Sequence, residues 1–393
     1  MKDTPSWLEE QADLLAQNVE GWETSVLERI GKRIRKIGRM TAADAQALNN
    51  IADVKGDMKT ITKSLATLTG ENIAQIEALY EKVISEQHDN NFPLYDYRNK
   101  KFVPLAENRR LQAIVRAYAR STGETMLNLS KTSVIGFSDA AGHFTSIEKA
   151  YTDVLDKAVM QVSSNATDFY TAMRGAITEL GGSGIRVNYG SGITRRLDTV
   201  VRQTLLWGAK QASNEYNKLI GEEIGCDGIE IDWHWHPRPS HEFMQGRQYA
   251  TGKEVTIDGK IYPSADDRAQ SGEYGISVNE ALADYGCLHY PTSIICGVSV
   301  PAYSEEELNR LNAENARQFE IGDKTQSGYE WKQDMRKLET EIRKQKSEKA
   351  ILKASGDKEG VQKCDKRIKK CMAKYKEISE ATGITGEPQR MRA

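Results

Sequence analysis

The residue types best suited to chemistry gather in one part of the sequence. Four of the six histidines lie between residues 234 and 289, with Cys287 two residues before the last of them. They are His234, His236, His241 and His289. Imidazole and thiolate groups are ligands that zinc prefers, and a His-x-His pair on a strand points both rings to one face. The sequence has neither a Cys-x-x-Cys pair nor a His-Glu-x-x-His motif. We therefore expect no metal and no other cofactor; a zinc site drawn from these five residues is the alternative.

Cys287 and His289 are also the pair that a cysteine hydrolase would use, as a thiolate nucleophile and its general base. Other nucleophile patterns are missing from the sequence. Ser183, Ser191 and Ser240 have no Gly-x-Ser-x-Gly frame, and the glycine-rich stretch around the first two has no Lys-Ser or Lys-Thr of a phosphate-binding loop. We expect a protein that is not an enzyme, and a metal-assisted or Cys/His hydrolase of nuclease-like type is the alternative.

The elements that must position these residues begin with a long helical part. Thr41 and Thr69 stand where helix N-caps belong, and Asp44 nearly completes a capping box after the first. A glycine cluster at 181–184 is a strong helix stop signal. Apolar residues at helical spacing predict several helices within residues 7–87, and further helices over residues 105–129, 146–163, 164–180 and from 192 or 193 to 224.

After Cys226 the pattern changes to that of a mixed α and β region. Residues 229–233 alternate apolar and polar side chains, which predicts a strand. Residues 253–262 predict a β-hairpin around Asp258-Gly259, a favoured two-residue turn. A capping box at Ser304 and Glu307 begins another helix. This region should be a small, loop-rich α+β domain.

Two charged helices that meet at Ser355-Gly-Asp form the last part of the chain. The apolar positions of the second helix have the 3, 4 spacing of a coiled-coil seam, and Met335, Leu338 and Ile342 give the first helix a matching stripe. We therefore predict an antiparallel helical hairpin. The seam of the second helix consists of Val361, Cys364, Ile368, Cys371, Tyr375 and Ile378.

Charge is unevenly distributed along the 393 residues. Residues 331–393 hold 18 Lys and Arg against 10 Asp and Glu, a net charge of +8, whereas the remainder carries −10. Such a basic tail is typical of contact with nucleic acid or an acidic partner, or of a solvated helical hairpin. Five scattered cysteines predict reduced thiols, and the lack of a long apolar stretch or signal-peptide core predicts a protein made in a cytoplasm with no membrane contact.

One block of residues resembles a known family. Arg238, Pro239, Ser240 and His241 are followed by Gln245-Gly246 and the aromatic Tyr249, and this order is similar to that of the phage minor capsid protein 2 family, relatives of the MuF-like head morphogenesis proteins. Met244 stands where the family usually has Trp. Further blocks follow in the family's order: residues 128–132, 189–192, Arg196, Asp198, Val201, Arg202, Cys287-Leu-His289, 297–304, Gln333, Arg336, Leu338, Glu339, Ile342 and Arg343.

The resemblance implies a minor head protein of a tailed bacteriophage, encoded beside the portal protein and associated with it. The virion head is then its location after assembly in the host cytoplasm. Expected partners are the portal protein, the major capsid or scaffold protein and packaged double-stranded DNA bound without sequence preference. The sequence patterns divide the chain into residues 1–225, which are helical, 226–327, which are α+β, and 328–393, the basic hairpin. The resemblance implies that the first part associates with portal or capsid protein and that the second is MuF-like. The fold is thus α+β, mainly α.

The sequence indicates the family, but it leaves several roles open for each motif. Prolines 237 and 239 would restrict the loop, Arg238 could pair with a carboxylate and His241 could cap a helix, so the block could fix a loop, form a partner-binding surface or take part in catalysis. Phosphate contacts need only exposed cations. The candidates for DNA contact are Arg336, Arg343, Lys344, Lys366, Arg367 and Lys370.

Overall fold

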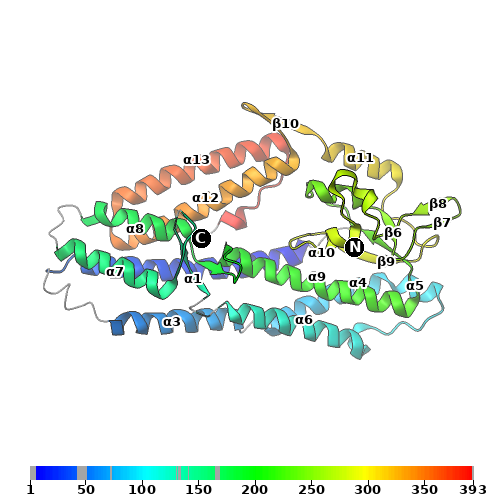
Figure 1. Ribbon diagram of the computed structural model, residues 1–393, viewed down its shortest axis with the longest axis horizontal. Coiled ribbons are helices and arrows are strands. Elements are labelled where there is room, and N and C mark those ends of the chain that lie inside the picture. The colour runs from blue at the N-terminus through cyan, green and yellow to red at the C-terminus, as the bar shows by residue number, and fades with distance from the viewer. Residues whose placement is uncertain are drawn as a thin grey trace. The chain divides into compact units, whose positions relative to one another are not determined.

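The computed structural model describes residues 6–41, 51–70, 73–129, 131, 134–139, 141–163 and 169–391. Long helices predominate over short antiparallel strands (Figure 1). The predicted α+β, mainly α class is confirmed. Among the described residues, no helix is both long and apolar enough to cross a membrane.

The chain forms two compact units, each assembled from three separate stretches of sequence. The first unit comprises residues 1–12, 73–123 and 203–332, and the second unit comprises residues 13–72, 124–202 and 333–393. Four long helices continue from one unit into the other, namely α1 (Ser6–Ile37), α6 (Arg109–Asn128), α9 (Leu197–Ile224) and α12 (Gly328–Ser355). The predicted boundaries at residues 225 and 327 stay a prediction about which parts fold independently.

Helices form most of the second unit. Most of α1 packs there with α3 (Ile51–Gly70), α7 (Ile147–Ser163) and α8 (Phe169–Ser183). Thr69 lies within the last turn of α3, so its predicted N-cap role is wrong; the helix predicted after Thr41, with Asp44, lies outside the described residues.

A small sheet in the second unit was not predicted. Its strand order is β2 (Phe144–Ser146), β1 (Ile135–Ser138), β3 (Arg186–Asn188) and β4 (Thr194–Arg196), all antiparallel. Strands of three or four residues are too short to show an alternating pattern. The helix predicted from residue 193 therefore begins later, at Leu197, because the three residues before it pair with β3.

The C-terminal hairpin is confirmed and belongs to the second unit. It consists of α12 (Gly328–Ser355) and α13 (Lys358–Thr382), and the Tyr375 hydroxyl donates to Glu339 across the pair at 2.9 Å. Glycines let other helices approach α12. A Cβ at Gly31 of α1 would lie 2.7 Å from the Ile351 carbonyl oxygen, and one at Gly181 of α8 would lie 2.5 Å from the Glu348 Cα. The hairpin is therefore part of a core.

A buried ion cluster joins three separate stretches of the second unit. The Arg196 guanidinium lies 3.1 Å from Asp198 and 3.5 Å from Glu23, and Arg343 of α12 lies 2.8 Å from Asp198 and 3.4 Å from Glu20. Burial opposes charge on Arg196, but Glu23 and Asp198 outweigh it and raise its pKa. Breaking such a cluster by removing one partner costs about 3–5 kcal/mol, because a charge is left buried and unpaired.

Glu20 gives this cluster a testable pH dependence. Burial and the neighbouring Asp198 raise the pKa of Glu20 from 4.5 to about 9. The folded chain therefore holds a proton that the unfolded chain releases above pH 4.5, so this group lowers stability progressively as pH rises from about 4.5 to about 9. Glu20→Gln imitates the protonated form. We expect its unfolding temperature to rise relative to the native chain across that range; a difference that stays constant with pH would contradict the assignment.

The first unit joins helices to a small sheet. Helices α4 (Ile73–Asn90), α5 (Phe92–Tyr97), most of α6 and most of α9 lie in it, with the single turn η1 (Leu105–Glu107). The Tyr80 hydroxyl of α4 donates to the Leu205 carbonyl of α9 at 2.9 Å and lies 3.0 Å from the Thr122 hydroxyl of α6. These buried bonds fix the three helices against one another.

The sheet that bears on the site has strand order β6 (Gln248–Ala250), β5 (Gly228–Ile231), β9 (Pro291–Ile294). Beside it are the turns η2 (Pro239–Met244) and η3 (Arg268–Tyr274) and the helices α10 (Val278–Ala283) and α11 (Glu305–Asn315). The predicted hairpin is confirmed as β7 (Val255–Ile257) and β8 (Lys260–Tyr262), with positive φ at Asp258 and Gly259. A second hairpin, β10 (Gln318–Ile321) and β11 (Lys324–Ser327), leads into α12.

Candidate functional site

The histidine-rich segment leaves the sheet earlier than predicted. Strand β5 ends at Ile231, so the strand expected to continue to Trp233 is two residues too long. His234 and His236 therefore lie in a loop, and His236 has a left-handed φ of 56°. Their rings have different neighbours: the His234 ring lies 4.3 Å from the His289 ring between centroids, tilted by 32°, whereas His236 faces Gly328, where a Cβ would lie 2.3 Å from its ring. The single-face His-x-His arrangement is wrong because there is no strand there.

Three other predicted residues do come together. The side-chain ligand atoms of His241, Cys287 and His289 all lie within 4.8 Å of one another. The Cys287 Sγ is 3.6 Å from the His289 Nδ1, and the rings of His241 and His289 are 5.7 Å apart. His241 comes from η2, and the other two residues come from the segment between α10 and β9.

Gln245 fixes the orientation of the His289 ring. Its side-chain oxygen accepts from the His234 backbone N–H at 3.0 Å, and the same oxygen lies 3.0 Å from the His289 Nε2. An amide oxygen carries no hydrogen and can only accept, so the His289 Nε2 must be the donor and carry the hydrogen. The Nδ1 lone pair is then directed toward the Cys287 thiol.

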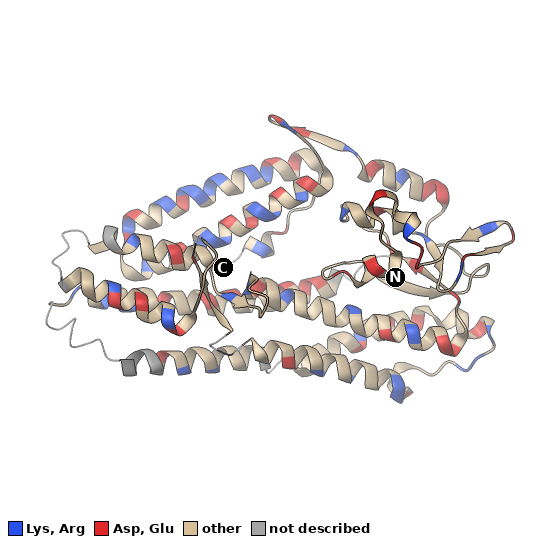
Figure 2. Cartoon of the chain, viewed as in Figure 1, with Lys and Arg blue, Asp and Glu red and all other residues tan. Residues whose placement is uncertain are grey.

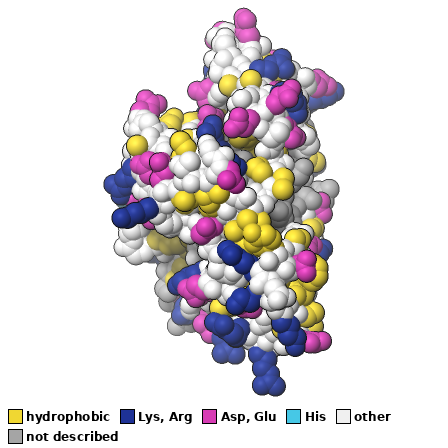
Figure 3. Space-filling model, turned by 90° about the vertical axis from the view of Figure 1, so that its right-hand side faces the viewer, with side chains coloured by type: hydrophobic (Ala, Val, Ile, Leu, Met, Phe, Trp, Pro, Cys, Tyr) yellow, Lys and Arg dark blue, Asp and Glu magenta, His cyan; other side chains and the backbone are white. Residues whose placement is uncertain are grey.

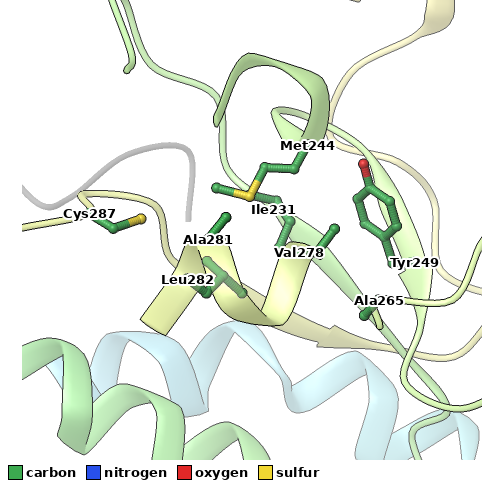
Figure 4. Packing of buried hydrophobic residues seen from close by; sticks show 8 residues of the cluster. All are labelled: Ile231, Met244, Tyr249, Ala265, Val278, Ala281, Leu282 and Cys287. Carbon is green, nitrogen blue, oxygen red and sulfur yellow. The ribbon is translucent and has the colours of Figure 1, made fainter. Parts of the chain in front are cut away.

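The cluster is buried beside an apolar core. His241, Cys287 and His289 are 2%, 6% and 1% exposed. Figure 4 shows Cys287 at the edge of the core cluster that includes Met244 and Ile231, with its sulfur directed toward it. No histidine side chain is visible among the coloured residues on the face that Figure 3 displays.

Burial also sets the protonation of the rings. It lowers the pKa of His241 to about 4, with help from the nearby Arg238, and it lowers the pKa of His289 well below the usual value, with help from His234. Both rings are therefore neutral at pH 7. A neutral imidazole keeps a lone pair that can accept a hydrogen bond or bind a metal.

The rest of the Arg-Pro-Ser-His block shapes the loop. Arg238 pairs with Asp284, which follows α10, and Pro239 opens η2. Ser240 is half-buried. Gly246 has a φ of 66°, and its N–H donates to the Ile231 carbonyl at 2.9 Å, so the turn returns to the end of β5. The loop-fixing role that the sequence left open has a direct geometric basis.

Comparison with known proteins gives the family. The sequence model for Phage minor capsid protein 2 matches residues 4–378, nearly the whole chain. The chain belongs to the phage minor capsid protein 2 family. No curated protein and no solved structure matches it. The family resemblance expected from the motifs is confirmed, and this phage minor capsid protein carries its motif residues at the η2 turn and in the α10–β9 segment.

The predicted DNA-contact residues of the capsid protein divide into two groups. Arg343 is committed to the buried ion cluster, and burial lowers the pKa of the Arg336 guanidinium. Both residues are half-buried, and the DNA contact predicted for them stays a prediction. Lys344 is half-buried beside Gly182. The three remaining candidates, on α13, are exposed: Lys366, Arg367 and Lys370.

Sequence reasoning missed Lys210 and Asp284. Lys210 of α9 is 1% exposed and donates to the Cys287 carbonyl at 3.2 Å. The Asp284 carboxylate lies 3.7 Å from the His241 Nε2. A lysine in a long helix and an aspartate in a loop carry no pattern that links them to a distant histidine, so no sequence signal marked them.

Gly246 offers a test of the loop in this capsid protein. A Cβ there would lie 2.7 Å from the Leu308 Cδ1 on a backbone with positive φ. We expect Gly246→Ala to lower the free energy of unfolding by about 1–3 kcal/mol, measured by urea denaturation. Gly252→Ala is the matched control, because Gly252 has nothing within 4 Å of its Cβ position. Equal effects of the two substitutions would show that the turn is not restricted.

Proposed function

We propose that this protein is a minor head component that associates with the portal protein and the major capsid or scaffold protein during head assembly, and contacts packaged DNA without sequence preference. The family match over residues 4–378 carries the proposal. Capsid proteins work in contact with other head proteins, so the family supports such partners in general. The association with the portal protein and the contact with DNA are more specific than the family match, and each needs its own test.

The charge of α13 supports the DNA role. Its inward side holds the buried residues Cys364, Tyr375 and Ile378, while Lys366 and Lys370 are exposed on the other side. Figure 2 shows Lys and Arg recurring along this helix. Cations on an exposed helix can neutralise phosphates without reading bases.

A second group of cations in the same unit supports the same role. The end of α1 and the end of α12 line a surface hollow with five basic side chains. Basic residues at a helix C-terminus also offset the helix dipole, but five from two helices exceed what that requires. They are Lys32, Arg35, Lys36, Arg39 and Lys353.

The DNA role predicts a strong dependence on salt. Each phosphate contact contributes about 0.9 to the slope of log affinity against log salt. Replacing Lys366, Arg367 and Lys370 together by alanine should weaken binding to duplexes of any sequence and reduce that slope by up to about 3, measured by fluorescence anisotropy.

The matched control removes the same charge elsewhere. Lys100, Lys101 and Lys253 are exposed in the first unit, and their triple alanine variant should keep most of the slope. If both variants bind alike, or if the native chain does not bind DNA even at low salt, α13 is not the contact.

The portal role predicts a stable complex. Co-expression of the full chain with the portal protein of the same phage should give a complex that survives size-exclusion chromatography. The full chain is needed because α12 is part of the second unit's core. Elution as separate proteins, in the presence and absence of the major capsid protein, would oppose this role.

We propose further that the protein is not an enzyme. Cys287 and His289 have a spacing that suits a thiol and its base, but they are 6% and 1% exposed. A nucleophile must reach its substrate, and burial of both groups supports a structural role instead.

A further inference from the structure

The His241, Cys287 and His289 cluster has features that a hydrogen-bonded core would not need. The His241 ring is 2% exposed, yet its Nε2 makes no hydrogen bond. Buried polar atoms nearly always have a partner, and one without a partner costs about 1–3 kcal/mol. His241 belongs to the same group of three residues as Cys287 and His289, whose side-chain ligand atoms all lie within 4.8 Å of one another.

We propose that these three side chains bind one zinc ion, which ties η2 to the segment between α10 and β9. This inference goes beyond the proposed function and does not depend on it. Two neutral imidazoles and a thiolate are ligands of structural and catalytic zinc alike.

The distances fit the metal. With Zn–S near 2.3 Å and Zn–N near 2.0–2.1 Å, tetrahedral geometry places sulfur and nitrogen ligands about 3.6 Å apart and two nitrogens about 3.3 Å apart. The Cys287 Sγ and the His289 Nδ1 are 3.6 Å apart, and all three ligand atoms lie within 4.8 Å. Small side-chain rotations would complete the geometry.

The surroundings of the ligands fit as well. Gln245 holds the hydrogen on the His289 Nε2 and leaves the Nδ1 lone pair directed at the thiol. A ligating histidine usually has such a partner on its other nitrogen, which fixes the tautomer.

The fourth position would be taken by water or by Asp284, which is also paired with Arg238. Zinc with one thiolate carries a net charge of +1, and the Asp284 carboxylate, 3.7 Å from the His241 Nε2, would offset it. Arg238 and Lys210 are cations close to the site, so the metal needs negatively charged groups to balance its charge.

A thiol–imidazole pair without metal is the competing explanation. It accounts for the contact of Cys287 with His289, but it leaves the His241 Nε2 without a hydrogen bond, 3.7 Å from the Asp284 carboxylate. Zinc accounts for the convergence of all three residues.

Metal content of the full-length protein tests the proposal. Protein purified without chelator should contain about one zinc per chain, and cobalt should give a thiolate-to-metal charge-transfer band together with tetrahedral d–d bands. Cys287→Ser should lose that band and the bound zinc. Chelation should lower the unfolding temperature. When zinc is returned, the unfolding temperature should recover and then rise further with the free zinc concentration.

Matched variants guard against unfolding as the cause of any loss. Cys296→Ser and His236→Gln change a buried cysteine and a loop histidine of the same unit outside the three ligands, and both should keep the metal.

Gln245→Leu should weaken zinc binding by roughly 10–100-fold, and Gln245→Glu, which keeps the acceptor, should restore most of it.

Two results would overturn the proposal. One is native protein that takes up neither zinc nor cobalt while folded, as judged by circular dichroism. The other is alkylation of Cys287 at the same rate with and without zinc, because a bound thiolate would be protected; this outcome would favour the metal-free pair.

Discussion

Arg196 is the constraint on which the second unit depends. Its side chain is 8% exposed, and a charge so far from water must be neutralised inside the protein. Asp198 lies beside it at the start of α9, Glu23 comes from α1, and Arg343 of α12 reaches the other oxygen of Asp198. Segments from the beginning, middle and end of the sequence therefore have to fold together around this one guanidinium.

This arrangement gives the hairpin two distinct sides. The inner side of α12 supplies Arg343 and Glu339 to the core, so its charges serve stability. The outer side of α13 carries exposed lysines that the core does not use. A basic composition alone cannot separate these two uses, because both consist of the same residue types.

Much of the fold was predictable from local patterns. The long helices, the Asp258-Gly259 hairpin and the break at residues 355–357 follow from periodicity, turn chemistry and capping, all of which act within a few residues. The sheet of β1 to β4 was not predictable, since its short strands are stabilised by partners distant in sequence. The grouping of segments into two units also depends on contacts such as Arg196 with Glu23, 173 residues apart.

The site was predictable as a set of residue types but not as a geometry. The sequence singled out His241, Cys287 and His289, and it also included His234, whose ring lies beside that of His289, and His236, whose ring lies against Gly328. Gln245 was recognised through the family motif alone; its physical role, holding one tautomer of His289, needs the folded loop. Loop conformation decides which of several histidines converge, and the sequence does not encode it in any local pattern.

Lysine footprinting inside intact phage heads is the most direct test of the proposal that α13 of this head component faces DNA. Acetylation followed by mass spectrometry should find Lys366 and Lys370 protected in DNA-filled heads and reactive in emptied heads, while Lys100 and Lys101 react equally in both. Equal reactivity of the α13 lysines in filled and emptied heads would show that α13 does not face DNA, and absence of the protein from purified heads would show that it is not a head component.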